Sequence, residues 1–369
     1  MVNVVLKRIL NVRNIFLVPI EPLDNRYTKQ WFDYIPSRLT QEFPDCQIVN
    51  VEGYAQSYER PTAGAFFDFA ATCEYKASQA KIIAQLFQSG DVKPNDIFFF
   101  TDAWNQTIHY VQYIAELTNI PVKCVGIWHA GWYDPTDILG FTVKNSNWIS
   151  QLEQSMFNAY DLNFFGTQQH WEKFKKRYPS AEYSKARVAG YPLDYLSQVS
   201  KLASFKDKRK MVVFPHRLND DKAPYIFDWI KDYVRSTMQR MDIDFVKTQE
   251  LGLSKEDYYK TLNESMVIFS ANKHENLGIG TFEAMMLGSC PLVPDKLSYH
   301  EMYPDQYKYD AVEDMYTDES YWKILATFIV DVIDNYDESV YNTIIEDSQA
   351  IFKKFFSCDD MLEIIKKDL

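Results

Sequence analysis

Short apolar runs alternate with helix-period segments along the chain, and this alternation limits the possible folds more than any other feature. Runs rich in β-branched and aromatic residues occupy 14–20, 46–52, 96–102, 122–128, 161–166, 186–191, 211–216, 242–248, 265–271 and 290–294. Amphipathic stretches with helical spacing lie between them, for example 76–88, 107–117, 146–160 and 223–241. Strands separated in this way predict βαβ units and parallel sheets, and near-continuous apolar strands agree because parallel strands are covered on both faces.

A chain of 369 residues is too long for one ordinary core and suits two domains. We expect an N-terminal α/β domain over 1–200 and a C-terminal α/β domain over 201–344, joined in the basic stretch 197–210. The final amphipathic segment, 345–369, is expected either to close the second domain or to pack back on the first.

Composition excludes several classes of protein. Hydrophobic residues make up 46% and charged residues 24% of the chain, which is typical of a globular protein. The first residues lack a signal-peptide pattern, and no uncharged apolar run approaches the ~20 residues of a membrane helix. The five cysteines are odd in number and show no C-x-x-C spacing, which favours neither disulfides nor zinc and fits a reducing cytoplasm. We expect a soluble, cytoplasmic monomer with no membrane partner.

The most informative segment is 274–295, HENLGIGTFEAMMLGSCPLVPD. A buried strand leads into Glu275, a glycine follows at 278, and a short helix carries Glu283. Free N–H groups at the start of that helix predict an anion site suited to a diphosphate. The alternative is a strand–turn–helix with two surface glutamates.

Two cations follow an earlier strand. In FPHRLNDDK, Arg217 stands at the strand end and Lys222 comes five residues later. Such cations can neutralise a pyrophosphate without metal, whereas an isolated pair of this kind is more often an ordinary solvated turn. His216 could assist or be a buried structural histidine.

A third candidate is His129, which ends the strand at 122–128 and is followed by Ala130 and Gly131. A histidine at a strand end is often structural, so the residues alone leave its role open. Asp134 and Asp137 could bind sugar or acceptor hydroxyls, or cap the following helix.

These motifs together resemble the retaining nucleotide-sugar glycosyltransferases with an E-x7-E signature, which have the GT-B architecture of two Rossmann-like domains facing across a cleft. The resemblance is strongest over 211–294. It implies that Glu275 contacts the donor sugar, that Glu283 holds the ribose, and that Asn276, Leu277 and Gly278 offer backbone N–H groups. It also implies that Arg217 and Lys222 bind the diphosphate and that His129 faces the reacting centre. No cofactor or metal is then required, and the donor substrate is a UDP-sugar.

The chain also departs from this family. The loop 18–31 contains no glycine where many members have a glycine-rich loop, so Glu21, Asn25, Arg26 and Trp31 are candidate binding residues without assigned roles. Asp242-Ile243-Asp244 fits the D-x-D motif of metal-dependent glycosyltransferases, but it opens a predicted strand, at the wrong end of the sheet for a ligand. We interpret it as a helix–strand junction.

The acceptor is suggested by charge and by two further resemblances. The net charge is −12, yet 173–210 holds eleven Lys or Arg against three acids, and it interleaves cations with aromatic residues. Lys173, Lys175, Lys176 and Arg177 are therefore candidate nucleic-acid contacts, although a solvated helix face is the commoner explanation. Segment 274–304 resembles tRNA-queuosine glycosyltransferases, and 128–140 resembles phage glycosyltransferases.

The sequence thus predicts transfer of glucose or a pentose such as arabinose from a UDP-sugar to 5-hydroxymethylcytosine in bacteriophage DNA, within an infected host. A flipped-out base could enter the aromatic-rich cleft. The alternatives are a glycosyltransferase acting on tRNA queuosine or a polysaccharide, an epimerase or phosphorylase on the same scaffold, and a non-catalytic nucleotide-sugar-binding protein.

Overall fold

The computed structural model describes residues 13–23, 26–55, 68–144 and 146–369. The chain forms two compact units. The first holds the described residues up to Gly166, together with His170–Pro192 and Asp359–Leu369; the second holds Thr167–Gln169 and Leu193–Cys358. The main change of unit, at 192–193, comes shortly before the basic stretch 197–210 in which the sequence places the domain boundary.

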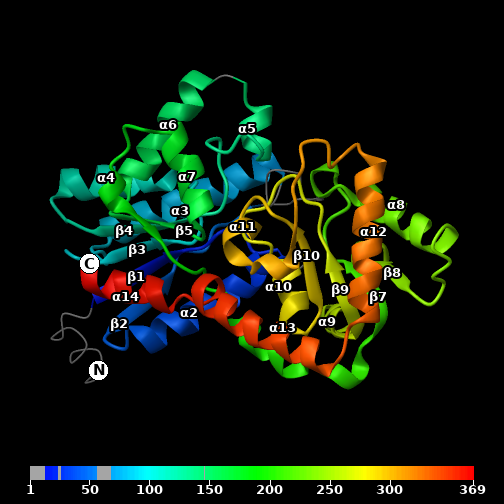
Figure 1. Ribbon diagram of the computed structural model, residues 1–369. Coiled ribbons are helices and arrows are strands. Elements are labelled where there is room, and N and C mark those ends of the chain that lie inside the picture. Colours follow the sequence, from blue (N-terminus) through cyan, green and yellow to red (C-terminus); the bar gives the residue numbers. More distant parts are fainter. Residues whose placement is uncertain (1–12, 24–25, 56–67, 145) are drawn as a thin grey trace. The chain divides into compact units, whose positions relative to one another are not determined.

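The first unit is built on a parallel six-stranded sheet with the order β2-β1-β3-β4-β5-β6 (Figure 1). Its strands are β1 (Arg13–Val18), β2 (Cys46–Asn50), β3 (Ile97–Phe100), β4 (Lys123–Trp128), β5 (Leu162–Phe165) and β6 (Ala186–Val188). All residues of β3 and β5 are buried, as expected for parallel strands covered by helices.

Helices connect these strands. They are α2 (Tyr27–Glu42), α3 (Phe69–Gln88), α4 (Thr107–Thr118), α5 (Ile138–Thr142), α6 (Ser146–Ala159) and α7 (Gln168–Arg177). The Asp68 carboxylate accepts a hydrogen bond from the Ala71 amide and so caps α3. Asp137 likewise accepts from the Leu139 amide at 3.0 Å and starts α5, which is the capping role considered for it above.

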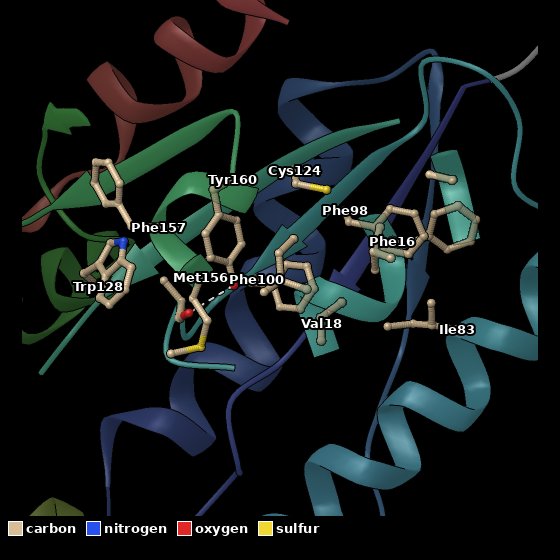
Figure 2. Packing of buried hydrophobic residues seen from close by; sticks show 14 of the residues in the cluster. Phe16, Val18, Ile83, Phe98, Phe100, Cys124, Trp128, Met156, Phe157 and Tyr160 are labelled. Atoms are coloured by element: carbon tan, nitrogen blue, oxygen red, sulfur yellow. Dashed lines mark hydrogen bonds between the residues drawn. The ribbon is translucent and has the colours of Figure 1, made fainter. Parts of the chain in front are cut away.

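Aromatic side chains fill the core of the first unit (Figure 2). The rings of Phe16 and Phe98 stack with centroids 4.8 Å apart, and Phe100 meets Tyr160 edge-on at 5.4 Å. The Tyr160 hydroxyl donates to the Ala103 carbonyl at 3.1 Å, so this buried polar atom is satisfied. The high aromatic content of the sequence is therefore used largely in packing.

The second unit repeats the plan with a parallel five-stranded sheet of order β11-β10-β9-β7-β8. Its strands are β7 (Arg209–Phe214), β8 (Asp244–Lys247), β9 (Ser265–Phe269), β10 (Cys290–Pro294) and β11 (Lys308–Tyr309). Its helices are α8 (Pro224–Ser236), α9 (Lys255–Glu264), α10 (Ile279–Met286), α11 (Tyr299–Met302), α12 (Glu319–Asp334) and α13 (Glu338–Ile351). A π-helical turn, Phe352–Phe356, precedes the last helix α14 (Asp359–Asp368), which belongs to the first unit.

The D-x-D sequence lies where a helix–strand junction is expected. Asp242 precedes β8 and is exposed, and its carboxylate pairs with Arg240 and Lys210, each at 2.8 Å. It is at the amino end of the strand, away from the sheet edge where open α/β sheets bind ligands.

Candidate functional site in the second unit

The order in which strands join the second sheet reverses between β7 and β9. From β7, the chain adds β8 on one side, and it then adds β9, β10 and β11 on the other side. Ligands of open α/β sheets bind at the carboxyl ends of the strands beside such a switch point. The loop after β7 carries His216, Arg217 and Lys222, and the loop after β9 carries Asn272 and Glu275. The topology therefore brings both sequence motifs to one sheet edge.

Glu275 is the centre of a hydrogen-bonded cluster. Its Oε2 lies 3.2 Å from Lys222 Nζ and accepts from Asn272 Nδ2 at 3.1 Å. Its Oε1 accepts from the backbone amides of Asn276 at 3.1 Å and Leu277 at 3.4 Å. The amides that the sequence assigns to the diphosphate therefore hold the Glu275 carboxylate in this structure.

The surroundings keep Glu275 ionised. Burial alone would raise its pKa, but Lys222, His216 and the Gly278 amide lower the pKa to about 2. Lys222 is itself only 6% exposed and also donates to the His274 carbonyl at 2.5 Å. A half-buried carboxylate and a buried ammonium thus stabilise each other within this loop.

Arg217 and Lys222 meet at a shared partner. Arg217 lies 3.6 Å and Lys222 Nζ 3.5 Å from the Asp221 carboxylate, so both cations stand at the same turn. They differ in burial, because 48% of the Arg217 side chain is exposed and only 8% of the Lys222 side chain. The exposed Arg217 side chain can therefore change its conformation to contact an anion. The Lys222 side chain is held by burial and by its contacts with Glu275 and the His274 carbonyl.

His216 is a buried neutral imidazole. Burial, with Lys222 and Arg217 nearby, lowers its pKa to about 3. One ring nitrogen hydrogen-bonds to the backbone of Phe269, an interaction that favours the charged form and so involves the carbonyl oxygen. Nε2 is buried and has no hydrogen-bond partner among the described residues.

The loop after β9 is held in shape by Tyr299, which is completely buried. Its hydroxyl lies within hydrogen-bond distance of Ser270 Oγ (3.1 Å), Asn272 Nδ2 (3.0 Å) and Thr281 Oγ1 (3.3 Å). Gly278 has φ +68°, and a Cβ there would lie 2.7 Å from the Tyr299 ring. The glycine predicted from sequence is thus required both by the backbone conformation and by this ring.

Glu283 is held by side chains of a neighbouring helix. It lies on α10 and is 4% exposed, and its carboxylate contacts three side chains of α9: Lys255 (3.0 Å), Tyr258 (3.0 Å) and Tyr259 (2.9 Å). The carboxylates of Glu283 and Glu275 therefore have different partners. The Tyr258 hydroxyl comes close to Gly280, where an added Cβ would lie 3.4 Å away, so Tyr258 links Glu283 to the start of α10.

The sequence analysis assigns no role to three residues of the site. Asn272, Asp221 and Tyr299 all contact motif residues or the loop that carries them. Asn272 and Asp221 lie within a few residues of the motifs and could have been proposed as polar groups after a strand. Tyr299 carries no such signal, because its role depends on a fold that returns it beneath Gly278.

In the first unit, His129 follows β4 and lies in an aromatic cluster. Its Nδ1 bonds the Tyr27 hydroxyl at 2.9 Å, and its Nε2 donates to the Thr101 carbonyl at 2.6 Å. Burial lowers the pKa of His129, and its ring centroid lies 4.9 Å from that of Trp31. Both ring nitrogens are engaged within the unit, and Trp31 is only 1% exposed.

Two other candidate residues of the loop 18–31 lie in the described part of the first unit. Arg26 is the half-buried residue that precedes α2, and Glu21 is completely buried. Asn25 lies outside the described residues.

The predicted basic contacts are partly used inside the first unit. Lys173 pairs with the buried Asp134 at 2.7 Å, and the Arg177 guanidinium lies over the Trp132 ring at 4.1 Å. Lys175 pairs with Glu172 at 3.5 Å, while Lys176 is exposed. The sequence could not show these pairings, because Asp134 and Trp132 lie far from α7 along the chain.

Among the residues that the structure describes, no helix is both long and apolar enough to cross a membrane. The described residues also contain no group of three or more His, Cys, Asp or Glu side chains that could hold a metal ion. All five cysteines are free.

No family model matches the chain. The tRNA-queuosine alpha-mannosyltransferase of Drosophila melanogaster is 29% identical over an alignment of 121 positions, and the match covers 27% of this chain and 32% of that protein. The chain therefore matches about a third of the length of this curated relative.

Solved structures extend the comparison over the whole chain. The catalytic domain of starch synthase IV from Arabidopsis thaliana, bound to ADP and acarbose, aligns with a TM-score of 0.59 and 11% identity, covering 97% of this chain and 98% of that one. A UDP-forming alpha,alpha-trehalose-phosphate synthase from Burkholderia xenovorans gives 0.60 and 11%, covering 96% and 98%.

The pneumococcal O-GlcNAc transferase GtfA, in complex with UDP and GlcNAc, gives a TM-score of 0.51 and 14% identity over 80% of this chain and 60% of that one. These likenesses show the fold. The chain has two parallel-sheet α/β domains of the GT-B type, as the sequence predicts.

Proposed function

We propose that this protein is a retaining glycosyltransferase that takes its sugar from a nucleotide-sugar donor. The observation that carries the proposal is the meeting of Glu275, Lys222 and Arg217 at the switch point of the second sheet. The GT-B fold agrees, since the chain resembles solved structures with bound UDP or ADP. A UDP-sugar is the donor that we expect.

In the proposed reaction, the bond between the anomeric carbon and the diphosphate oxygen breaks, and the nucleoside diphosphate leaves with the electron pair. An acceptor hydroxyl forms the new C–O bond on the same face, and its proton passes to the leaving diphosphate. Arg217 and the start of α10 stabilise the charge that develops on the diphosphate. Lys222 holds Glu275 in the position in which it contacts the sugar. Glu283 contacts the ribose, and the ribose replaces the Tyr258 hydroxyl as its hydrogen-bond donor.

The first unit is proposed to bind the acceptor. Two acceptors come from the sequence: 5-hydroxymethylcytosine in phage DNA and queuosine in tRNA. The match to a protein named as a tRNA-queuosine alpha-mannosyltransferase supports the second, although it covers 27% of this chain. No comparison supports the phage DNA acceptor. In either case Lys175, Lys176 and Arg177 are the cations that we expect to meet phosphates.

The experiment is transfer of radiolabelled sugar from a panel of UDP-sugars and GDP-mannose to tRNA, to hydroxymethylated DNA and to a polysaccharide. Glu275→Ala and Arg217→Ala are expected to abolish most transfer while the protein stays folded. Lys231→Ala, a change at a half-buried lysine of α8 that pairs with Asp228 at 3.7 Å, is the control and should transfer normally. Undiminished turnover in both site variants would refute the proposed site, and donor turnover without any acceptor would favour an epimerase or phosphorylase.

A further inference from the structure

Two acceptor atoms near Glu275 are buried and have no partner in the described part of the chain. They are His216 Nε2 and Asn272 Oδ1. A buried polar atom that lacks a hydrogen bond costs free energy, and native proteins keep few of them. Two such atoms around one carboxylate therefore indicate a ligand that supplies the missing hydrogens.

The chemistry of each atom can be assigned. Glu275 is ionised and can only accept, so the group of Asn272 that faces it at 3.1 Å must be the amide nitrogen. The same nitrogen faces the Tyr299 hydroxyl at 3.0 Å. The amide orientation is thereby fixed, and Oδ1 is the atom that lacks a donor among the described residues.

The tautomer of His216 follows in the same way. His216 Nε2 has no partner among the described residues, so hydrogen bonding of the ring to the Phe269 backbone falls to Nδ1. A backbone carbonyl only accepts, and Nδ1 therefore carries the hydrogen. Since the ring is neutral, Nε2 carries a lone pair and no hydrogen. A diphosphate oxygen is also an acceptor and cannot satisfy it.

The set around Glu275 thus consists of acceptors: a carboxylate, an imidazole nitrogen and an amide oxygen. Sugar hydroxyls are the part of a nucleotide sugar that donates hydrogen bonds. We propose that His216 Nε2 and Asn272 Oδ1 bind hydroxyl groups of the donor sugar, and that the site therefore selects a neutral sugar with free hydroxyls. This inference rests on the proposed function, and it assigns His216 to the sugar instead of the diphosphate.

The test compares two affinities in one titration series. Calorimetry gives Kd for UDP and for the tightest of UDP-glucose, UDP-galactose and UDP-arabinose, and the ratio of the two Kd values measures the sugar's contribution. His216→Phe keeps a ring against Phe214 but removes the acceptor nitrogen. We expect the sugar's contribution to fall about tenfold in this variant, with UDP affinity changed less than about twofold. His216→Gln, which offers an amide oxygen, should recover part of the loss.

Donors in which one hydroxyl is replaced by fluorine complete the design, because fluorine cannot donate a hydrogen bond. One such analogue should bind the unaltered protein about tenfold more weakly than its parent, and His216→Phe should bind both equally. A second analogue should show this pattern with Asn272→Ala. If no nucleotide or nucleotide sugar binds at all, the proposed function fails. If UDP binds but the sugar's contribution is the same in His216→Phe, as an ordered water at Nε2 would give, the inference alone is overturned.

Discussion

Lys222 and Arg217 are five residues apart in the sequence and both lie near the Asp221 carboxylate, but their roles differ. Lys222 neutralises a carboxylate that is only 19% exposed, and Arg217 has no other ion pair among the residues described. Removing Lys222 leaves Glu275 as an uncompensated charge, which costs roughly 3–5 kcal/mol for a fully buried pair. Removing Arg217 leaves no such charge.

We therefore predict that Lys222→Met lowers the free energy of unfolding by several kcal/mol, whereas Arg217→Ala changes it by less than about 0.5 kcal/mol. Arg217→Ala should still reduce transfer by about 10²–10³-fold, because it removes a group that stabilises the leaving diphosphate. Urea unfolding and turnover, measured on both variants, separate the two effects. Equal stability losses would show that the two cations are equivalent.

Glu275 gives a pH dependence whose sign is fixed by its environment. Its pKa is lowered from 4.5 to about 2 in the folded protein, so its ionisation stabilises the fold above about pH 4.5. That stability, on the order of 3 kcal/mol, is lost as pH falls from 4.5 toward 2. Glu275→Gln does not titrate, so the difference in unfolding free energy between the two proteins should be constant from pH 7 to pH 5 and shrink below that. A difference that persists unchanged at pH 3 would contradict this prediction.

At the scale of elements, the turn between β9 and α10 depends on one glycine. Gly278→Ala would force a Cβ to within 2.7 Å of the Tyr299 ring at a φ of +68°. Gly252 is a matched control, because its φ is +58° and a Cβ there meets nothing within 4 Å. Gly252→Ala should cost about 1 kcal/mol from backbone strain alone, and Gly278→Ala should cost roughly 1–3 kcal/mol more from the clash.

Donor binding provides the second measurement for this pair of variants. Gly278→Ala should weaken UDP binding because the clash displaces the start of α10, which is proposed to meet the diphosphate, whereas Gly252→Ala should bind UDP normally. Similar losses of stability in both variants would mean that the Tyr299 ring moves aside without cost.

Elements were easier to predict from the sequence than the contacts between them. The strands at 290–294 and 265–271 are confirmed within two residues, because apolar runs between helical segments mark buried parallel strands. The short β11 was not expected, since two residues carry no periodicity. Lys173 illustrates the limit for the site: its charge suggested a nucleic-acid contact, but the fold pairs it with Asp134, thirty-nine positions away along the chain.

At the scale of the whole molecule, the chain leaves its first unit and returns to it at the end. The last helix, α14, buries Met361, Leu362 and Ile365 in the first unit. Asp359 pairs with Arg38 and Asp368 with Arg187, each at 2.7 Å. The amphipathic pattern of 345–369 could not decide between the two destinations, because an apolar face does not specify which surface covers it.

We predict that ending the chain after Cys358 destabilises the first unit and leaves the second intact. Burial of each of the three apolar side chains contributes about 1.5–3 kcal/mol, whereas the exposed Arg38–Asp359 pair contributes less than about 1 kcal/mol.

Tryptophan fluorescence during urea unfolding reports mainly on the first unit, which contains Trp31, Trp104, Trp128, Trp132, Trp148 and Trp171. Its transition should move to lower urea, while Asp359→Asn should leave it almost unchanged. UDP binding should persist, because Arg217, the start of α10 and Glu283, which are proposed to meet the diphosphate and the ribose, belong to the second unit. A truncated protein that unfolds at the same urea concentration would show that α14 adds no stability to the first unit.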